Sequence, residues 1–272
     1  MEPGLALALG FAAGAGVASA VAALLARRAK RRALDSERRA RDAEHLAYIG
    51  TLTGGLAHEI RNPLSTLQLN VQLLREDLER PGRALEPRLA RRLDTLQHEA
   101  DRLHQILDDF LKLAGKHEVR LTVQALNPIV EEFVDFYADR LQTSNIQMRT
   151  SLADGLPPVA VDADRLKQAL ANLVLNAEAA MDDGGDLMIA TEGDRRGVRL
   201  HVTDTGCGIG QEDLDRIFQP YYSTRSGGTG LGLPAVRRIV TEHKGTLDVH
   251  SEVGRGTRFT IHLPAAEEGE ED

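Results

Sequence analysis

The sequence predicts an α+β protein in three parts: an N-terminal transmembrane helix, a helical hairpin that pairs with a second copy into a four-helix bundle, and an α/β sandwich domain. Three observations favour this organisation. An uncharged segment opens the chain, two heptad patterns follow, and after Gly115 short alternating strands recur among amphipathic helices. We expect the parts at residues 5–26 (transmembrane helix), 27–48 (linker helix), 49–116 (hairpin), 117–265 (sandwich domain) and 266–272 (disordered acidic tail).

Composition narrows the class of protein. A length of 272 residues suits about two domains, and a net charge of -8 disfavours nucleic-acid binding. The single cysteine, Cys207, excludes an internal disulfide and fits a reducing compartment. Aromatic residues make up only 4% and tryptophan is absent, so we expect a core of Leu, Val, Ile and Ala.

Residues 5–26 are predicted to form a transmembrane helix. These 22 uncharged residues would extend roughly 33 Å as a helix, about the hydrocarbon thickness of a bilayer. Five basic residues follow at once, which predicts a single-pass protein in contact with lipid here, with the rest of the chain in the cytoplasm: Arg27, Arg28, Lys30, Arg31 and Arg32. A cleaved signal peptide is the alternative, but the basic segment that should precede the apolar stretch is missing. Almost nothing precedes Leu5, so we expect no extracytoplasmic sensing domain.

Two heptad seams predict the hairpin. The first comprises Leu46, Ile49, Thr53, Leu56, Ile60, Pro63, Leu67 and Leu74, and the second Leu89, Leu93, Leu96, Ala100, Leu103, Leu107, Phe110 and Ala114. Pro81, Gly82 and Pro87 mark the turn between them. Two amphipathic helices have too narrow a core to be stable alone, so we expect a homodimer with a four-helix bundle.

His58 lies at a water-facing position of the first heptad helix. Glu59 is its neighbour and Asn62 lies one turn further on, which gives an exposed imidazole a carboxylate and an amide within reach. A coiled-coil spacer without chemistry would explain the seam, but not this polar cluster.

The sandwich domain carries a helix, expected at 164–181, whose apolar face includes Leu166, Leu170, Leu173, Val174 and Ala177. Asn172 and Asn176 lie four residues apart on its polar stripe. An amide oxygen is a suitable ligand for Mg²⁺, which keeps several waters and shares phosphate oxygens. Solvated polar residues are the simpler alternative.

Two glycine-rich loops follow. Asp204 ends a strand and precedes glycines at 206, 208 and 210, so its carboxylate is placed to accept from an exocyclic amine while the glycines admit a flat ring. Residues 227–233 lead into a helix whose N-terminal N–H groups and dipole favour phosphate. This loop is not a P-loop, because no Lys-Ser or Lys-Thr follows its glycines.

Five motifs in this order resemble those of the sensor histidine kinases of two-component systems, over about residues 45–264. The H box matches Leu56 to Leu64, the N box Asn172 to Ala177, the G1 box Asp204 to Gly210, the F box Ile217 to Tyr222, and the G2 box Gly228 to Leu233. The resemblance implies a protein-histidine kinase of the bacterial inner membrane. Its sandwich domain would be an ATP-binding domain of the GHKL type.

The resemblance also implies residue roles. ATP would phosphorylate His58, with Glu59 as general base, and the phosphoryl group would move to an aspartate of a cytoplasmic response regulator. Asn62 would position water for a phosphatase activity on that regulator, and Asn176 would hold Mg²⁺. The implied nucleotide-binding residues are Asn172, Asn176, Asp204, Gly206, Gly208, Arg225, Gly228, Thr229, Gly230, Leu231 and Gly232. The exposed stripe of Ser65, Gln68, Leu69 and Gln72 would contact the regulator.

Two departures from the family pattern are visible. Arg225 replaces a common lysine in the lid over the nucleotide, at roughly 219–229, and Tyr221 and Tyr222 replace phenylalanines. Two other functions are alternatives. A GHKL-type ATPase related to gyrase or MutL would need a water-activating glutamate where Asn172 stands, and a membrane scaffold that only senses nucleotide would not need His58 and Glu59.

Overall fold

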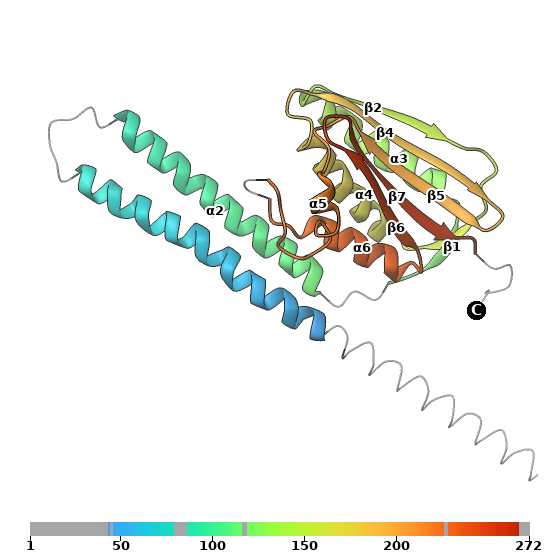
Figure 1. Cartoon of the computed structure of the whole chain (residues 1–272), viewed down its shortest axis with the longest axis horizontal. Helices are drawn as coiled ribbons and strands as arrows, with labels where there is room; N and C mark the ends of the chain where they lie inside the picture. Colours follow the sequence, from blue (N-terminus) through green and yellow to red (C-terminus); the bar gives the residue numbers. More distant parts are fainter. Residues whose placement is uncertain (1–42, 44–45, 79–85, 116–118, 226–227, 267–272) are drawn as a thin grey trace, which may run out of the picture. The chain divides into compact units, whose positions relative to one another are not determined.

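The computed structural model describes residue 43 and residues 46–78, 86–115, 119–225 and 228–266 (Figure 1). The expected transmembrane helix at 5–26, nearly all of the linker helix, and the acidic residues 267–272 lie outside this part. Among the helices of the described residues, none combines the length and apolar character needed to cross a bilayer.

Two antiparallel helices form the hairpin. One runs without a break over residues 46–78, and α2 spans Glu86–Ala114. Two ion pairs join them: Arg92 Nε lies 2.9 Å from Asp77 Oδ2 near the turn, and Arg102 Nη2 lies 3.7 Å from Glu59 Oε2 near the middle of both helices. The predicted antiparallel helical hairpin is therefore observed.

The hairpin leaves part of its predicted seam uncovered. Ile106 and Leu113 are buried, but Leu93 and Leu107 of the predicted seam are 58% and 47% exposed. Two helices bury only the stripe along which they touch, so apolar residues on either side remain open in a single chain.

The second part of the chain is an α+β domain. Its strands are β1 (Thr122–Gln124), β2 (Ile146–Leu152), β3 (Val159–Val161), β4 (Gly185–Asp194), β5 (Gly197–Asp204), β6 (Thr246–Glu252) and β7 (Gly256–Pro264). Its helices are α3 (Leu126–Thr143), α4 (Ala163–Glu178), α5 (Gln211–Leu214) and α6 (Gly232–Glu242). The main sheet has the order β2-β4-β5-β7-β6, and β1 pairs with β3 in a small antiparallel sheet. Only the β2–β4 pair of the main sheet is parallel, so the sheet is mixed.

Helices α3, α4 and α6 cover one face of the main sheet (Figure 1). Burial alternates along β5, whose even-numbered residues from Val198 to Asp204 face the core. The predicted apolar face of α4 is buried throughout, with side chains no more than 2% exposed at Leu166, Leu170, Leu173, Val174 and Ala177. This packing fixes α4 on the sheet and turns its polar stripe away from it.

Candidate functional site

Asp204 ends β5 and is almost fully buried, with 6% of its surface exposed. Its Oδ1 accepts hydrogen bonds from the backbone N–H groups of Gly206, at 2.9 Å, and Thr257, at 3.2 Å. No donor among the described residues is bonded to Oδ2. The carboxylate is thus held by one oxygen and has the other free for a ligand donor.

The surroundings of Asp204 shift its acidity. Burial raises the pKa of this carboxyl above its ordinary value, and the N–H groups of Gly206 and Thr257 and the charge of Arg225 only partly oppose that rise. A buried carboxylate whose pKa is raised costs stability at neutral pH, which is a common property of binding sites.

The glycines after Asp204 are required by the protein itself. A Cβ on Gly206 would lie 2.6 Å from the Ala180 carbonyl oxygen, and Gly208 adopts a φ of +73° beside the Glu252 backbone. The sequence argument assigned these glycines to the approach of a flat ring. The structure shows that close backbone packing already demands them, because a side chain would displace the loop.

Asn172 and Asn176 lie on α4 and face the start of α6. Asn172 Nδ2 donates to the Gly232 carbonyl oxygen at 3.3 Å, and a Cβ on Gly232 would lie 3.8 Å from Asn176 Nδ2. Asn176 Nδ2 is buried and has no hydrogen-bond partner among the residues that the structure describes. Since buried donors are normally paired, this unpaired NH2 group is suited to a hydrogen-bond acceptor from outside, such as a phosphate oxygen.

The asparagine site fits a magnesium ion that is shared with phosphate. The Asn176 carboxamide is a hard oxygen ligand, and Mg²⁺ needs only one or two protein ligands when phosphates and water fill its octahedron. Among the described residues, no cluster of three His, Cys, Asp or Glu side chains forms a metal cage.

The second glycine loop packs on the segment that precedes it. Gly230 has a φ of +66°, and a Cβ there would lie 2.5 Å from the Tyr221 carbonyl carbon. Tyr221 donates its backbone N–H to the Gly230 oxygen at 3.1 Å. Arg225 donates from Nη1 to the Asn176 carbonyl oxygen at 2.8 Å, so a lid residue contacts α4.

The other four residues of this loop that were predicted to bind nucleotide differ from one another in what they contact. A Cβ on Gly228 would meet Ser223 Oγ at 2.5 Å, and Thr229 Oγ1 accepts from the Leu231 N–H at 3.4 Å. The Leu231 side chain is 1% exposed. Leu231 can therefore contribute only its backbone to a ligand, whereas Gly232 opens α6 beside the asparagines.

Tyr222 shows what a tyrosine adds at this position. Its hydroxyl donates to Asp213 Oδ1, and the Arg216 guanidinium lies 4.2 Å from the ring centroid. The hydrogen bond to Asp213, more than burial, raises the pKa of the phenol. A phenylalanine could not make this bond, so Tyr222 ties the loop to the segment around α5.

The hairpin carries the other predicted cluster. His58 and Asn62 are both exposed, as expected, and the half-buried Glu59 turns toward α2, where it pairs with Arg102. Neighbouring residues on a helix point about 100° apart, which is why Glu59 does not lie against the imidazole. Sequence reasoning missed Arg102; its position one residue before the predicted seam residue Leu103 was the only signal.

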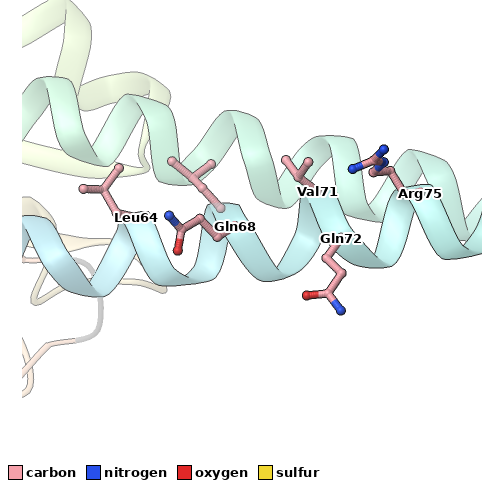
Figure 2. Close-up of a pocket in the computed structure, with 6 residues that line it drawn as sticks. Leu64, Gln68, Val71, Gln72 and Arg75 are labelled. Atoms are coloured by element: carbon pink, nitrogen blue, oxygen red, sulfur yellow. The ribbon is translucent and has the colours of Figure 1, made fainter.

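An apolar groove runs along the helix of residues 46–78, about two to five turns beyond His58. Figure 2 shows Leu64, Gln68, Val71, Gln72 and Arg75 along it; with Leu67 they enclose about 490 Å³. Leu64, Val71 and Leu78 recur at intervals of seven and are 44%, 49% and 67% exposed. The heptad prediction did not include this stripe. The predicted regulator contact Leu69 is exposed on another face, by 55%.

Comparison with known families agrees with both parts. Residues 48–118 match the His Kinase A (phospho-acceptor) domain, and residues 161–267 match the histidine kinase-, DNA gyrase B- and HSP90-like ATPase family. The first match contains His58, Glu59 and Asn62, and the second contains both asparagines and both glycine loops.

Curated relatives are sensor kinases. The chain is 38% identical to the sensor histidine kinase ZraS of Escherichia coli K12 over 221 residues, which cover 81% of this chain and 46% of that protein. It is 34% identical to sporulation kinase E of Bacillus subtilis over 236 residues, which cover 86% of this chain and 31% of that kinase. The chain therefore spans about half or less of the length of these relatives.

Two solved structures of histidine kinases are similar in fold to this chain. The histidine kinase ThkA, solved in complex with the response regulator protein TrrA, aligns with a TM-score of 0.65 and 28% identity over 83% of this chain and 64% of that one. Full-length ShkA in complex with AMPPNP aligns with a TM-score of 0.55 and 26% identity over 78% of this chain and 46% of that one. A phospho-acceptor hairpin followed by a GHKL-type ATPase domain, with these relatives, shows that the chain belongs to the sensor histidine kinases of two-component systems.

Proposed function

We propose that this chain is a protein-histidine kinase that uses ATP and Mg²⁺ to phosphorylate His58 and passes the phosphoryl group to an aspartate of a response regulator. The observation that carries the proposal is the free Oδ2 of the buried Asp204, on the same domain as the orphan amide of Asn176 and the glycine start of α6. In this proposal the Asp204 carboxylate binds the adenine amine, and Asn176 and the start of α6 bind the phosphates.

In the proposed nucleotide site, Asp204 Oδ2 accepts from the adenine amine and Asn176 gives its amide oxygen to Mg²⁺. The N–H groups at the start of α6, from Gly230 to Gly232, bind phosphate oxygens with the help of the helix dipole. Arg225 and the loop from Gly228 to Thr229 close over them. The bound Mg²⁺ would neutralise phosphate charge as the γ-phosphoryl group transfers.

The proposed chemistry at His58 is an in-line displacement. One ring nitrogen bonds to the γ-phosphorus while the bond to the bridging oxygen breaks and ADP leaves, and Glu59 takes the proton from the other nitrogen. Glu59 must turn from Arg102 toward His58 to do this. The 3.7 Å ion pair is long and 30% exposed on the arginine side, so the turn costs little.

The proposed regulator surface lies on the His58 face. Ser65, Gln68, Leu69 and Gln72 are exposed there, and ThkA, a similar structure, was solved with a response regulator. We expect Leu69→Arg to slow phosphoryl transfer at unchanged His58 phosphorylation, with Val253→Arg, on an exposed turn, as the control. An equal loss of both steps would remove Leu69 from the docking surface.

Asn62 lies one turn beyond His58 and is exposed, which suits the proposed role of positioning water for phosphatase activity. Replacing it with Ala should preserve His58 phosphorylation and stop dephosphorylation of the regulator. Unchanged dephosphorylation would refute this role.

We also propose that two copies pair through the exposed stripe of Leu64, Val71 and Leu78, which forms a four-helix bundle. Residues 5–26 would anchor the dimer in the bacterial cytoplasmic membrane with the catalytic part in the cytoplasm. The support for the anchor is the uncharged segment and its basic flank. Sedimentation of the chain with membranes, and its release on deletion of residues 1–26, tests the anchor.

Hydrolysis of the gyrase type is the second candidate, and the position of Asn172 argues against it. Its amide donates to Gly232 and joins two helices, and an amide cannot act as a base toward water. A nucleotide-sensing scaffold is the third candidate. The ATPase family match covers gyrase as well as kinases, so the distinction needs an experiment.

The deciding experiment is incubation of the chain with γ-labelled ATP and Mg²⁺. We expect acid-labile, alkali-stable label in the wild type and none in His58→Gln. Binding of ATP without label in the wild type would favour the scaffold, and release of phosphate without protein label would favour the ATPase.

A further inference from the structure

His243 follows the last residue of α6 and is only 2% exposed. Its Nδ1 lies 2.7 Å from the Ile239 carbonyl oxygen, and its Nε2 lies 3.0 Å from the backbone nitrogen of Asp162. A carbonyl only accepts and a backbone N–H only donates, so these two neighbours place the proton on Nδ1 and keep Nε2 as an acceptor. The ring thereby joins the C-terminus of α6 to the N-terminus of α4.

The residue that His243 contacts is itself the cap of α4. The Asp162 side chain accepts from the N–H groups of Arg165, at 3.2 Å, and Arg120, at 3.0 Å. Burial opposes the charge on Asp162, but these two bonds and the nearby positive charge together outweigh it and lower the pKa of the carboxyl. The cap is thus a fixed, charged point, and His243 holds the chain at that point.

A second contact joins the same two helix ends. Arg165, which is 9% exposed, places Nη2 at 3.1 Å from Glu242 Oε2, and Arg238 Nε lies 2.8 Å from Glu242 Oε1. These paired charges and His243 form a clamp between the start of α4 and the end of α6, and we call the four residues His243, Asp162, Arg165 and Glu242 the helix clamp.

The helix clamp and the nucleotide site lie at opposite ends of the same helix pair. From Asp162 to Asn172 is about 15 Å along α4, and from His243 to Gly232 is about 16 Å along α6, at 1.5 Å per residue. These nearly equal lengths bring Asn172 and Gly232 together at 3.3 Å. A shift of one helix by a single residue would separate them, because each residue moves the helix by about 1.5 Å.

We propose that His243 is a positioning residue for nucleotide binding, which fixes the axial register of α6 on α4 and so holds the glycine start of α6 beside Asn172 and Asn176. This inference rests on the proposed nucleotide site. His243 lies too far along α6 to touch the nucleotide itself and acts only through the two helices.

Two substitutions separate the two bonds of the ring. In His243→Gln the longer amide reaches the place of Nε2 and can accept from Asp162, whereas in His243→Asn the shorter amide reaches only the place of Nδ1 and can donate only to Ile239. We expect His243→Asn to weaken binding of AMPPNP with Mg²⁺ by the full chain roughly three- to tenfold, the range of one net hydrogen bond. We expect His243→Gln to remain within about twofold of the wild type, since it keeps that bond.

Three measurements make the test decisive: calorimetric affinity for AMPPNP, thermal unfolding without nucleotide, and hydrogen exchange of the Asp162 amide. The exposed His250, changed to Asn, is the matched control and should leave all three unchanged. Across the variants, affinity for AMPPNP should fall together with the hydrogen-exchange protection of the Asp162 amide. His243→Gln therefore remains informative by itself if His243→Asn fails to fold.

An Asn variant that loses Asp162 protection and melts earlier, yet binds AMPPNP like the wild type, would show a purely structural role and overturn the inference. A wild type that binds no AMPPNP would instead refute the proposed nucleotide site, and with it the role of His243.

Discussion

At the scale of single residues, the surroundings of Asp204 have two opposing effects on its carboxylate. Its burial makes the ionised form costly, and the two backbone N–H groups at Oδ1 hold it in place for a ligand. A buried, ionisable residue that costs stability in this way is a candidate for ligand binding.

Asp204→Asn should therefore separate stability from affinity. The amide can still accept at Oδ1, but its other end donates and opposes an adenine amine, so we expect ATP affinity to fall about ten- to a hundredfold, the range of a charged hydrogen bond.

The melting temperature of Asp204→Asn without nucleotide should rise at pH 7. A carboxyl whose pKa is higher in the folded than in the unfolded chain stabilises the fold when protonated, and this is lost as pH rises through the folded pKa. The advantage of the variant should thus shrink as pH falls. Calorimetry and melting curves from acid to neutral pH check both; unchanged affinity would mean that Asp204 does not read the base.

At the scale of elements, the loop before α6 depends on one left-handed residue. Gly230 has a φ of +66° and lies against the Tyr221 backbone, whereas Gly155, with a φ of +67°, has nothing within 4 Å of a Cβ. The two glycines share a conformation and differ only in their surroundings.

Gly230→Ala and Gly155→Ala form a matched pair. Gly155→Ala should lose roughly 1–2 kcal/mol of unfolding free energy, because alanine is strained in the left-handed region. Gly230→Ala should lose more, because its methyl group would also meet the Tyr221 backbone at 2.5 Å. Only Gly230→Ala should also weaken ATP binding, since its methyl group forces the loop away from Tyr221. Denaturant unfolding and nucleotide titration measure the two effects. Equal ATP affinity in both variants would exclude this loop from the phosphate site.

At the scale of the whole molecule, the hairpin presents more apolar surface than one chain can cover. Leu64, Val71 and Leu78 form a stripe about a third of a turn from His58, so a second copy can cover it without covering the phosphoacceptor.

Val71→Glu should weaken the dimer at least tenfold, because a carboxylate enclosed in an apolar interface loses its hydration. Ser65→Glu adds the same charge to the exposed His58 face of the same helix and should leave the dimer intact. Light scattering over a dilution series gives the dissociation constant of each variant. A Val71→Glu protein that dimerises like the wild type would place the interface elsewhere.

The sequence alone predicted those features of the molecule that depend on local patterns of residues. Heptads at intervals of seven predicted both hairpin helices, and spacings of three and four gave the apolar face of α4, all of which is buried. Ordered motifs predicted the family, and the exposed position of His58 followed from its place in the heptad. The membrane segment, the residue roles and the regulator remain predictions.

Only the tertiary structure showed contacts between residues far apart in the chain. The sequence could not show that Arg102 pairs with Glu59, that Gly206 is required by Ala180, or that His243 holds Asp162. Each depends on two segments 26 to 81 residues apart meeting within a few ångströms. No periodicity encodes such a meeting, because it follows from how the helices and the sheet pack.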